Sequence, residues 1–494
     1  MYTHIFETLS GNKAYIKNVF KDCDDIVTRE MLIGVNNAFK LFMVYTDNIA
    51  SNKIIEESIM TNLMTRSEVF VHNEERLLDV IKSEIIAVGE VKKEEFFENI
   101  ITSVLLGDTV IFSDKSKKAL VISTRGWPTR GVGKTETEVV VQGPKDAFTE
   151  AASINTVLIR RRIRDSRLKV NRKKIGVRSK TDIAIMYMED LVRPEILNDV
   201  KNRIYSLNVD ALFDAGYMGQ LIERDHLSPF PQVQLTERPD KAASAILEGR
   251  VVVVVDNSPF VMVLPATLNV FFQSAEDYYE RWEIMSLVRI IRYGAAALAV
   301  VLPGLYIALM IYHPEMIPTA LALKIAASRE AVPFPTVVEV VIMEIEFELL
   351  REAGVRLPGP IGSTMGIVGG IIIGQAAVEA GLVSPAVIII SALTGICTFV
   401  IPNTQLVSGL RLSKYFIILM SAALGLFGLW IGVLGILIHL SSLKSFNVAY
   451  LSPYASAEIN GYADLKDTII RLPLFMMKKR PVFTRENADK RMGG

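Results

Sequence analysis

Apolar and polar positions follow different patterns in different parts of the chain. In residues 1–284, short apolar runs are separated by polar turns, which is typical of a domain that folds in water. Residues 285–440 contain long apolar stretches with few charges, and residues 441–494 are polar again. We therefore expect a soluble N-terminal domain, a helical transmembrane domain and a C-terminal tail with these boundaries.

Strand patterns dominate the soluble part. Pairs of apolar runs around a polar turn predict one hairpin at Thr109–Phe112 and Ala119–Ser123, and another at Val251–Val255 and Phe260–Leu264. Asp182–Met188 predicts a further strand, and helical spacing occurs between the strands. The expected fold is mixed α/β (α+β), in two subdomains.

Four apolar stretches reach or approach the roughly 20 helical residues that cross a hydrocarbon core. They are Tyr293–Tyr312, Ile361–Leu382, Pro385–Ile401 and Tyr415–Leu440. The alternative, buried helices of a large soluble protein, does not easily explain four such stretches in one region. The pattern therefore predicts an integral membrane protein.

One further stretch, residues 335–352, is apolar by content but carries five glutamates. These are Glu339, Glu344, Glu346, Glu348 and Glu352. On a helix the first and third share one stripe, whereas the other three form a series on nearly the opposite side. Because carboxylates facing lipid are costly, we expect an interfacial or bundle-buried helix and not a lipid-facing span.

Basic residues set the expected orientation. Arg289 and Arg292 precede the first span and Lys478–Arg480 lies in the tail, so the positive-inside rule puts both ends in the cytoplasm. This requires an even number of crossings, here four plus the acidic helix. Arg411 and Lys414 then fall on the outer side; counting the acidic helix as a span would bring them inside but move the tail outside.

Composition excludes several classes of function. The 54 Lys+Arg balance 54 Asp+Glu, so nothing argues for nucleic-acid binding. Two cysteines, Cys23 and Cys397, cannot form a disulfide framework, and five scattered histidines lack the spacing of metal ligands. No nucleophile motif is present. We expect no enzyme, no cofactor and no metal site.

Gly131–Thr135 resembles the end of a phosphate-binding loop. The full motif needs a glycine five residues before Gly133, where Pro128 stands. The following residues, Glu136–Val141, have the pattern of a strand and not of the required helix. A polar turn between strands is therefore the better interpretation.

Residues 159–180 form a basic run, which begins with Arg160, Arg161, Arg162 and Arg164. It contains no aromatic residue, which weakens the case for single-stranded nucleic acid, whose bases stack on rings. Contact with anionic lipid or with another subunit fits a membrane protein better. A solvated helix face is an equally open alternative.

Small residues mark two helical stripes in the apolar region. The first comprises Gly362, Gly366, Gly370 and Gly374, and the second comprises Ser421, Gly425, Gly428, Gly432, Gly435 and His439. Missing side chains let another helix approach closely, so we expect two tight seams, within one chain or between copies. Gln375 and Glu379 give the first helix a polar side, which suits a water-filled path or a hydrogen bond to a neighbouring helix.

Ordered stretches between about Gly126 and Pro481 resemble a known family. They include Gly143-Pro144, Leu158–Ile163, Ile175–Thr181, Ser228–Gln232, Thr236–Asp240, Asp256–Phe260, Glu276–Tyr279, Pro333–Pro335, Glu348–Pro358, Gly374–Gly381, Asp467 and Arg471–Pro473. Together they resemble the A-subunit family of bacterial spore germinant receptors, the GerA type. The first hundred or so residues contribute no match, and Gly133-Lys134-Thr135 departs from the Glu-Pro expected there.

The resemblance implies a subunit of the spore inner membrane, and the basic residues put its N-terminal domain and tail on the cytoplasmic side. It also implies a nutrient-binding B subunit and a C-subunit lipoprotein as partners, and a ring of copies, a pentamer, that conducts ions when nutrient binds. Acidic rings select cations. The expected ion path is therefore formed by Glu339, Glu344, Glu346, Glu348, Gln375 and Glu379.

Three other functions remain possible at this point. The first is an accessory channel protein of the same wider family, encoded with dipicolinate-transport genes, which amplifies germination. The second is a secondary transporter, although four spans without a repeat fit that class poorly. The third is a non-conducting signalling scaffold that docks partners through Arg160–Lys180. The long match at Pro333–Pro358 favours the receptor.

Overall fold

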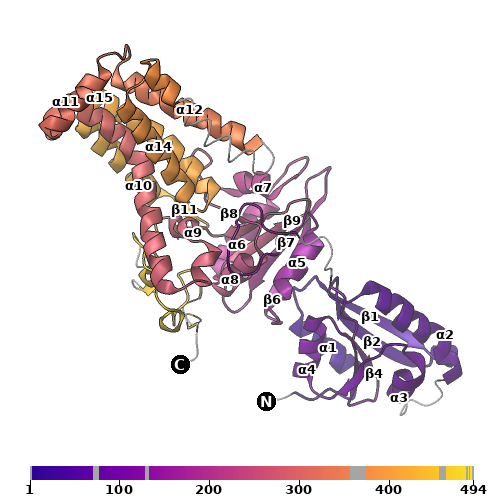
Figure 1. The fold of residues 1–494 in the computed structure, drawn as a ribbon. Coiled ribbons are helices and arrows are strands. Elements are labelled where there is room, and N and C mark those ends of the chain that lie inside the picture. Colours follow the sequence, from indigo (N-terminus) through magenta and orange to yellow (C-terminus); the bar gives the residue numbers. More distant parts are fainter. Residues whose placement is uncertain are drawn as a thin grey trace. The chain divides into compact units, whose positions relative to one another are not determined.

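A computed structural model describes residues 3–70, 77–127, 133–356, 374–455, 463–485, 488 and 490–491. The chain forms two compact units, and Figure 1 labels their helices and strands. The first unit consists of Met1–Glu223, Val233–Pro265 and Lys478–Gly494, and the second of Arg224–Gln232 and Ala266–Met477. The chain therefore passes between the units four times.

The first unit begins with a five-stranded antiparallel sheet of order β1-β2-β4-β5-β3. Its strands are β1 (Ile26–Ile33), β2 (Phe39–Thr46), β3 (Val91–Glu94), β4 (Thr109–Ser113) and β5 (Ala119–Ile122). Its helices are α1 (Leu9–Val19), η1 (Val35–Asn37), η2 (Ile54–Met60), α2 (Thr61–Phe70), α3 (Leu77–Val80), η4 (Ile81–Ile85) and α4 (Phe97–Leu106).

Both faces of this first sheet are buried. Along β2, Leu41 and Met43 belong to the core that includes residues of η2 and η4, whereas Phe42 and Val44 belong to the core that includes residues of α1 and α4. This follows from the period of two in a strand, which sends successive side chains to opposite faces. The predicted hairpin of β4 and β5 is confirmed.

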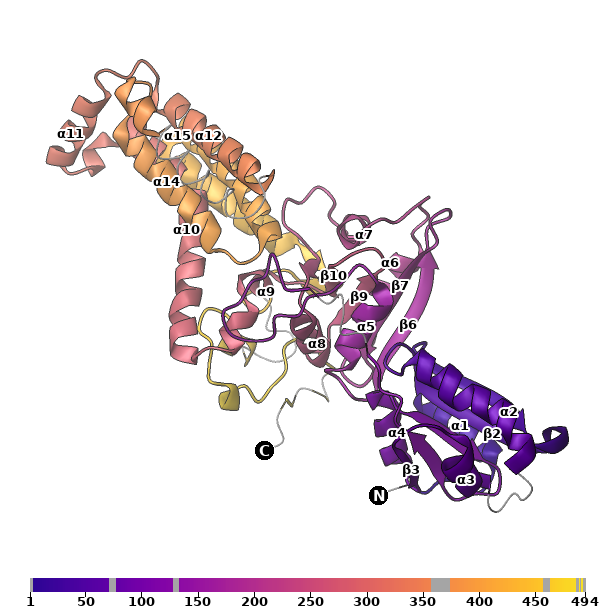
Figure 2. The ribbon, with the colours of Figure 1, turned by 45° about the vertical axis from the view of Figure 1, so that its right-hand side comes forward.

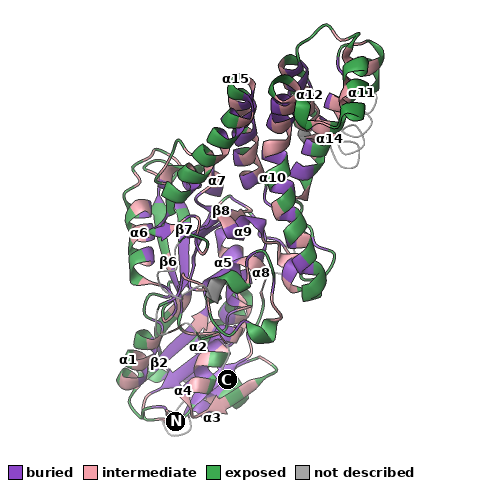
Figure 3. Cartoon of the chain, turned by 90° about the vertical axis from the view of Figure 1, so that its left-hand side faces the viewer, coloured by how far each residue is buried: buried purple, intermediate pink, exposed green. Residues whose placement is uncertain are grey.

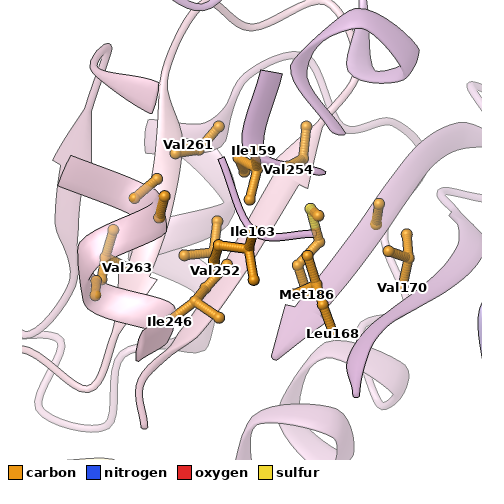
Figure 4. Close-up of a cluster of buried hydrophobic side chains, with 14 of the residues drawn as sticks. Ile159, Ile163, Leu168, Val170, Met186, Ile246, Val252, Val254, Val261 and Val263 are labelled. Atoms are coloured by element: carbon orange, nitrogen blue, oxygen red, sulfur yellow. The ribbon is translucent and has the colours of Figure 1, made fainter. Parts of the chain in front are cut away.

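The first unit continues with a second antiparallel sheet of order β6-β7-β9-β10-β8. Its strands are β6 (Leu168–Ile175), β7 (Thr181–Met188), β8 (Gln234–Thr236), β9 (Val251–Val255) and β10 (Val261–Leu264), and its helices are α5 (Ala152–Arg160), α6 (Pro194–Tyr205), α7 (Ala215–Ile222) and α8 (Pro239–Leu247). The predicted strand at β7 and hairpin of β9 and β10 are confirmed. Figure 4 shows the core, in which Val252, Val254 and Val263 meet Ile159 and Ile246.

The second unit is mainly helical, as Figure 2 shows. Its elements are α9 (Leu268–Phe272), η5 (Ala275–Tyr278), α10 (Trp282–Tyr312), η6 (Pro314–Met316), α11 (Thr319–Arg329), α12 (Thr336–Arg356), α14 (Pro385–Val400), α15 (Thr404–Ser442), β11 (Lys444–Ser445), β12 (Val448–Ala449), η7 (Ala463–Lys466) and η8 (Leu474–Met476). Helices α10, α12, α14 and α15 pack together. Within the described ranges, α10 and α15 have the length and composition to cross a membrane.

Helix α15 reverses its direction at Gly425, whose φ of 63° and ψ of −141° are not helical. Residues 426–442 then pack back along residues 404–424: Gly432 lies against Ile417 and Met420, and Gly435 against Phe416. At about 1.5 Å per residue the two legs are about 31 and 25 Å long. The stretch 415–440, which we expected as one span, is therefore parts of two antiparallel helices.

The helices of the second unit expose many large apolar side chains. On α14, Ile389, Ile396 and Phe399 are exposed, whereas Ser391 and Thr394 are buried. Figure 3 colours the chain by burial. Since water-soluble proteins show the opposite distribution, this surface is suited to a hydrocarbon environment. Of the expected stretch 361–382, residues 361–373 lie outside the described part, and residues 374–379 are helical.

Candidate functional site

Helix α12 places its glutamates beside basic side chains of the same unit. Glu344 and Lys414 are 1% and 4% exposed and form an ion pair. Nearby, Arg411 Nε donates to Glu348 Oε1 at 2.8 Å. A buried charge is tolerated when a partner compensates it. These two carboxylates therefore balance the two bases of α15 that sequence reasoning assigned to the outer side.

The side chain of Glu339, a residue of α12, reaches the N-terminal end of α14. Its Oε2 accepts a hydrogen bond from the Ser384 backbone N–H at 2.9 Å, and its Oε1 accepts one from Arg329 Nη2 at 2.8 Å. Ser384 is the residue before the first turn of α14, which opens with Pro385. A carboxylate at a helix N-terminus is stabilised by the unpaired N–H groups and the helix dipole. Glu339 therefore fastens α12 to α14.

The other three expected path residues have different surroundings. Glu346 is partly buried and has no cationic partner among the described residues. Gln375 Nε2 donates to Glu379 Oε1 at 3.0 Å, and both residues are exposed. The structure thus separates the six candidates into three ion-paired glutamates, one hydrogen-bonded pair and Glu346.

The second glycine stripe lies inside one chain. Gly428, Gly432 and Gly435 all face the first leg of α15, and Gly425 forms the reversal. In the first stripe, Gly362, Gly366 and Gly370 lie outside the described residues. The fourth member, Gly374, is buried, and a Cβ there would lie 3.5 Å from Ile388.

Sequence reasoning missed the close approach of α10 to α15. A Cβ on Gly304 would lie 2.7 Å from Ile417 Cγ2 and 2.8 Å from Ser421 Oγ. The sequence signal for this close approach was Gly304, which follows Pro303 in the apolar run.

Sequence reasoning also missed a charged network at the N-terminal end of α10. Arg289 is fully buried; its Nε donates to Asp277 Oδ2 at 2.8 Å and its Nη1 to Asp467 Oδ1 at 2.7 Å. Arg292 Nη1 donates to Asp277 Oδ1 at 2.8 Å, and Tyr278 OH donates to Asp467 Oδ2 at 2.7 Å. The two arginines used to infer orientation are therefore paired, and Asp467 of the tail lies at the start of α10.

Three of the four arginines that open the basic run contact other side chains of the first unit. Arg160 is buried and binds Asp25 through two hydrogen bonds of 2.9 Å. Arg162 binds Asp146 at 2.7 Å, and Arg161 lies 4.8 Å from the centre of the Trp127 ring. Arg164 is exposed, and its Nε donates to the Arg161 carbonyl at 3.3 Å. Of these four arginines, Arg164 is the one whose side chain is most open to a partner.

Residues 137 and 138, which follow the sequence compared with a phosphate-binding loop, bind the carboxylate of Glu237. Its Oε1 accepts from Thr137 N at 2.6 Å, Thr137 Oγ1 at 2.9 Å and Glu138 N at 2.7 Å. The expected strand at residues 136–141 is wrong, because these N–H groups bind a carboxylate and not a neighbouring strand. Burial alone would raise the pKa of Glu237, but these hydrogen bonds outweigh it and hold the pKa below its usual value.

Comparison with known proteins places these features in a family. The family described as Bacillus/Clostridium GerA spore germination protein matches residues 14–483. The chain is 39% identical over 489 residues to "Spore germination protein KA" of Bacillus subtilis (strain 168), which covers 99% of this chain and 89% of that protein. It is 36% identical over 491 residues to "Uncharacterized membrane protein YfkQ" of the same organism, covering 98% and 93%.

A crystal structure of the N-terminal domain of the A subunit of the Bacillus megaterium spore germinant receptor GerK3 is also similar. Its sequence identity is 30% and its TM-score 0.45, and the match covers 54% of this chain and 98% of that one.

The chain is thus a membrane protein of spore germination, in a class of receptors and not of enzymes. It belongs to the GerA family, as an A subunit of a germinant receptor. The family match begins at residue 14 and so includes most of the first hundred residues, where our sequence analysis found no resemblance.

Proposed function

We propose that this A subunit acts as a nutrient-gated cation channel of the spore inner membrane, formed by several copies, in a receptor completed by a B subunit and a C-subunit lipoprotein. Nutrient binds the B subunit, and the A subunits respond by opening. The number of copies that the family resemblance implies is five. An accessory channel that amplifies germination would use the same conducting machinery without the nutrient-binding partner.

The observation that carries the proposal is the combination of a packed interior and an apolar exterior in the second unit. Inside, Val340, Met343, Val387, Ile307 and Ile418 form one buried cluster. Within the described part of this unit, such close packing leaves no room for a water-filled path inside one copy. Charged residues at membrane depth commonly mark ion pathways. Because the interior of one copy is packed, such a pathway would have to lie between several copies.

The tail supports the proposed orientation. Asp467 and Arg289 are paired at the start of α10, so the tail and the entry to α10 lie at the same end of the second unit. If α10 crosses the membrane, the chain must return across it before residue 467, which gives an even number of crossings. We place this end, with the N-terminal domain, on the cytoplasmic side of the inner membrane.

A non-conducting scaffold is favoured by one specific observation. Three of the expected path glutamates, Glu339, Glu344 and Glu348, already have basic partners in their own chain. Paired in this way, α12 could transmit a structural change without passing ions.

The decisive experiment reconstitutes the full-length chain with its B and C subunits in planar bilayers. Stepwise currents that appear on adding nutrient, together with a multimeric mass in detergent, would support the channel. Currents from the A subunit alone that ignore nutrient would favour the accessory channel. Silent bilayers together with a monomeric mass would favour the scaffold and overturn the proposal.

A further inference from the structure

Helix α12 has two unlike sides. Ile342, Glu346 and Leu349 follow one another at the spacing i, i+4 and i+7, so they share one side of the helix. Ile342 and Leu349 are 42% and 66% exposed, and Glu346 is partly buried between them. In contrast, Met343 and Glu344 are buried against the other helices of the unit.

Among the residues that the structure describes, no basic side chain is paired with Glu346. The nearby bases Arg329, Arg411 and Lys414 are paired with other glutamates of α12. Arg351 donates to Thr398 Oγ1 at 2.6 Å and lies 5.5 Å from the centre of the Phe399 ring. Residues 357–373, which follow α12, contain no Lys, Arg or His in their sequence.

An ionised carboxylate without a partner is costly against lipid tails and is found facing water or another charged group. The neighbours of Glu346 on this side are apolar, so the cost is not offset by local polar groups. The side of α12 that carries Ile342, Glu346 and Leu349 therefore does not face lipid.

From this we infer that Ile342, Glu346 and Leu349 line the water-filled path between copies, and that Glu346 is the residue that selects cations. This inference rests on the proposed channel and narrows its ion path from six residues to one carboxylate. In an assembled ring, Glu346 contributes one negative charge from each copy. Ile342 and Leu349 form apolar constrictions on either side of it, of the kind that close a pore by excluding water.

The test of selectivity uses the full chain with its B and C subunits in planar bilayers under a KCl gradient. Glu346→Gln removes one charge per copy at almost constant volume. The cation-to-anion permeability ratio is expected to fall several-fold, and Glu346→Lys is expected to reverse the preference. Glu315→Gln is the matched control, because that carboxylate is exposed and lies in η6, outside the six expected path residues. Unchanged selectivity in Glu346→Gln, or an equal change in Glu315→Gln, would overturn the inference.

A second measurement does not depend on current. Ile342→Cys is treated with a charged, membrane-impermeant thiol reagent in the assembled receptor, and Ile396→Cys on the exposed apolar face of α14 is the control. The natural thiols, Cys23 and Cys397, are buried. We expect labelling at 342 and little at 396. Labelling without current would refute the channel but keep the water-facing stripe, whereas no labelling at 342 would refute the stripe itself.

Discussion

Single residues in this protein show how buried charge is kept stable. Arg160 with Asp25 in the first unit and Lys414 with Glu344 in the second are each buried almost completely. Removing one partner of such a pair leaves an uncompensated charge, which typically costs about 3–5 kcal/mol, whereas replacing both with apolar residues is often neutral.

We therefore expect Glu344→Gln to lower the thermal stability of the detergent-solubilised protein markedly, because Lys414 loses its partner. The double variant Glu344→Met with Lys414→Met should recover most of the loss. Thermal melts of the three proteins in one detergent give the comparison. A double variant as unstable as the single one would show that the pair contributes more than charge balance.

Glu237 gives a prediction of pH dependence. Its pKa is lowered in the folded protein by hydrogen bonds from residues 137 and 138, so it contributes stability above the usual glutamate pKa of about 4.3 and loses this contribution as the pH falls through the lowered value. Glu237→Gln should therefore destabilise the protein at pH 7 by about 1–3 kcal/mol. The difference from the natural protein should shrink progressively below pH 4.3.

Chemical unfolding of both proteins at several pH values measures this difference. A comparison is Glu98→Gln, since the half-buried Glu98 of α4 also has a pKa lowered by a hydrogen bond from the Thr3 backbone N–H. If the loss in Glu237→Gln were independent of pH down to the most acidic point, the carboxylate would not be the group responsible.

At the level of elements, the sequence predicted two hairpins and the strand β7, but neither the remaining strands nor their partners. The valines of β9 and β10 marked a hairpin because a polar turn separates two apolar runs. Nothing in the sequence placed β8 beside β10 or paired β3 with β5, because these contacts join short strands far apart in the chain. Long-range pairing depends on the packing of the whole unit and leaves little local signal.

The reversal in α15 could not be predicted for a related reason. The stripe of small residues put Gly428, Gly432 and Gly435 on one face, and the partner of that face is the preceding part of the same apolar run. Only the conformation of Gly425 identifies the turn. Among the six residues expected to form an ion path, likewise, the sequence supplied the glutamates but not the bases that pair with three of them.

Gly425→Ala should disrupt the hairpin. The backbone conformation at Gly425 is one that essentially only glycine adopts. A Cβ there would also lie 2.8 Å from Tyr312 Cγ. We expect a loss of about 1–3 kcal/mol. Gly435→Ala is the matched control, because its Cβ would make an ordinary contact of 3.8 Å with Phe416. Equal melting temperatures for the two variants in detergent would argue against a hairpin.

At the scale of the whole molecule, the sequence predicted an α+β N-terminal region followed by a helical region with long apolar stretches. It did not predict that the tail contributes to both units. The tail has no long apolar pattern, and its contacts depend on individual side chains such as Asp467 and Arg471. Only the resemblance drew attention to these two residues, and it did not say what they bind.

Asp467→Asn should release the tail from α10, since the residue binds Arg289 and Tyr278 through its carboxylate and Gln273 through its carbonyl. We expect faster proteolysis within residues 463–477 of the full-length protein, with the first unit unaffected. Mass spectrometry of the fragments locates the cuts. Glu315→Gln, an exposed change in η6, should leave the digestion pattern as it is. Identical patterns for all three proteins would show that Asp467 does not hold the tail.

Residues near the C-terminal end also complete the first unit, most of which is synthesised before the second unit. Thr484 pairs with Val192, the Arg485 N–H donates to the Leu191 carbonyl at 3.0 Å, and Gly249 lies against Thr484. A ribosome releases these residues only after every helix of the second unit has been synthesised. The first unit therefore lacks these contacts until the second unit has been synthesised and inserted. A chain that stalls during insertion would leave the backbone at Leu191 and Val192 without its partners and open to quality-control proteases.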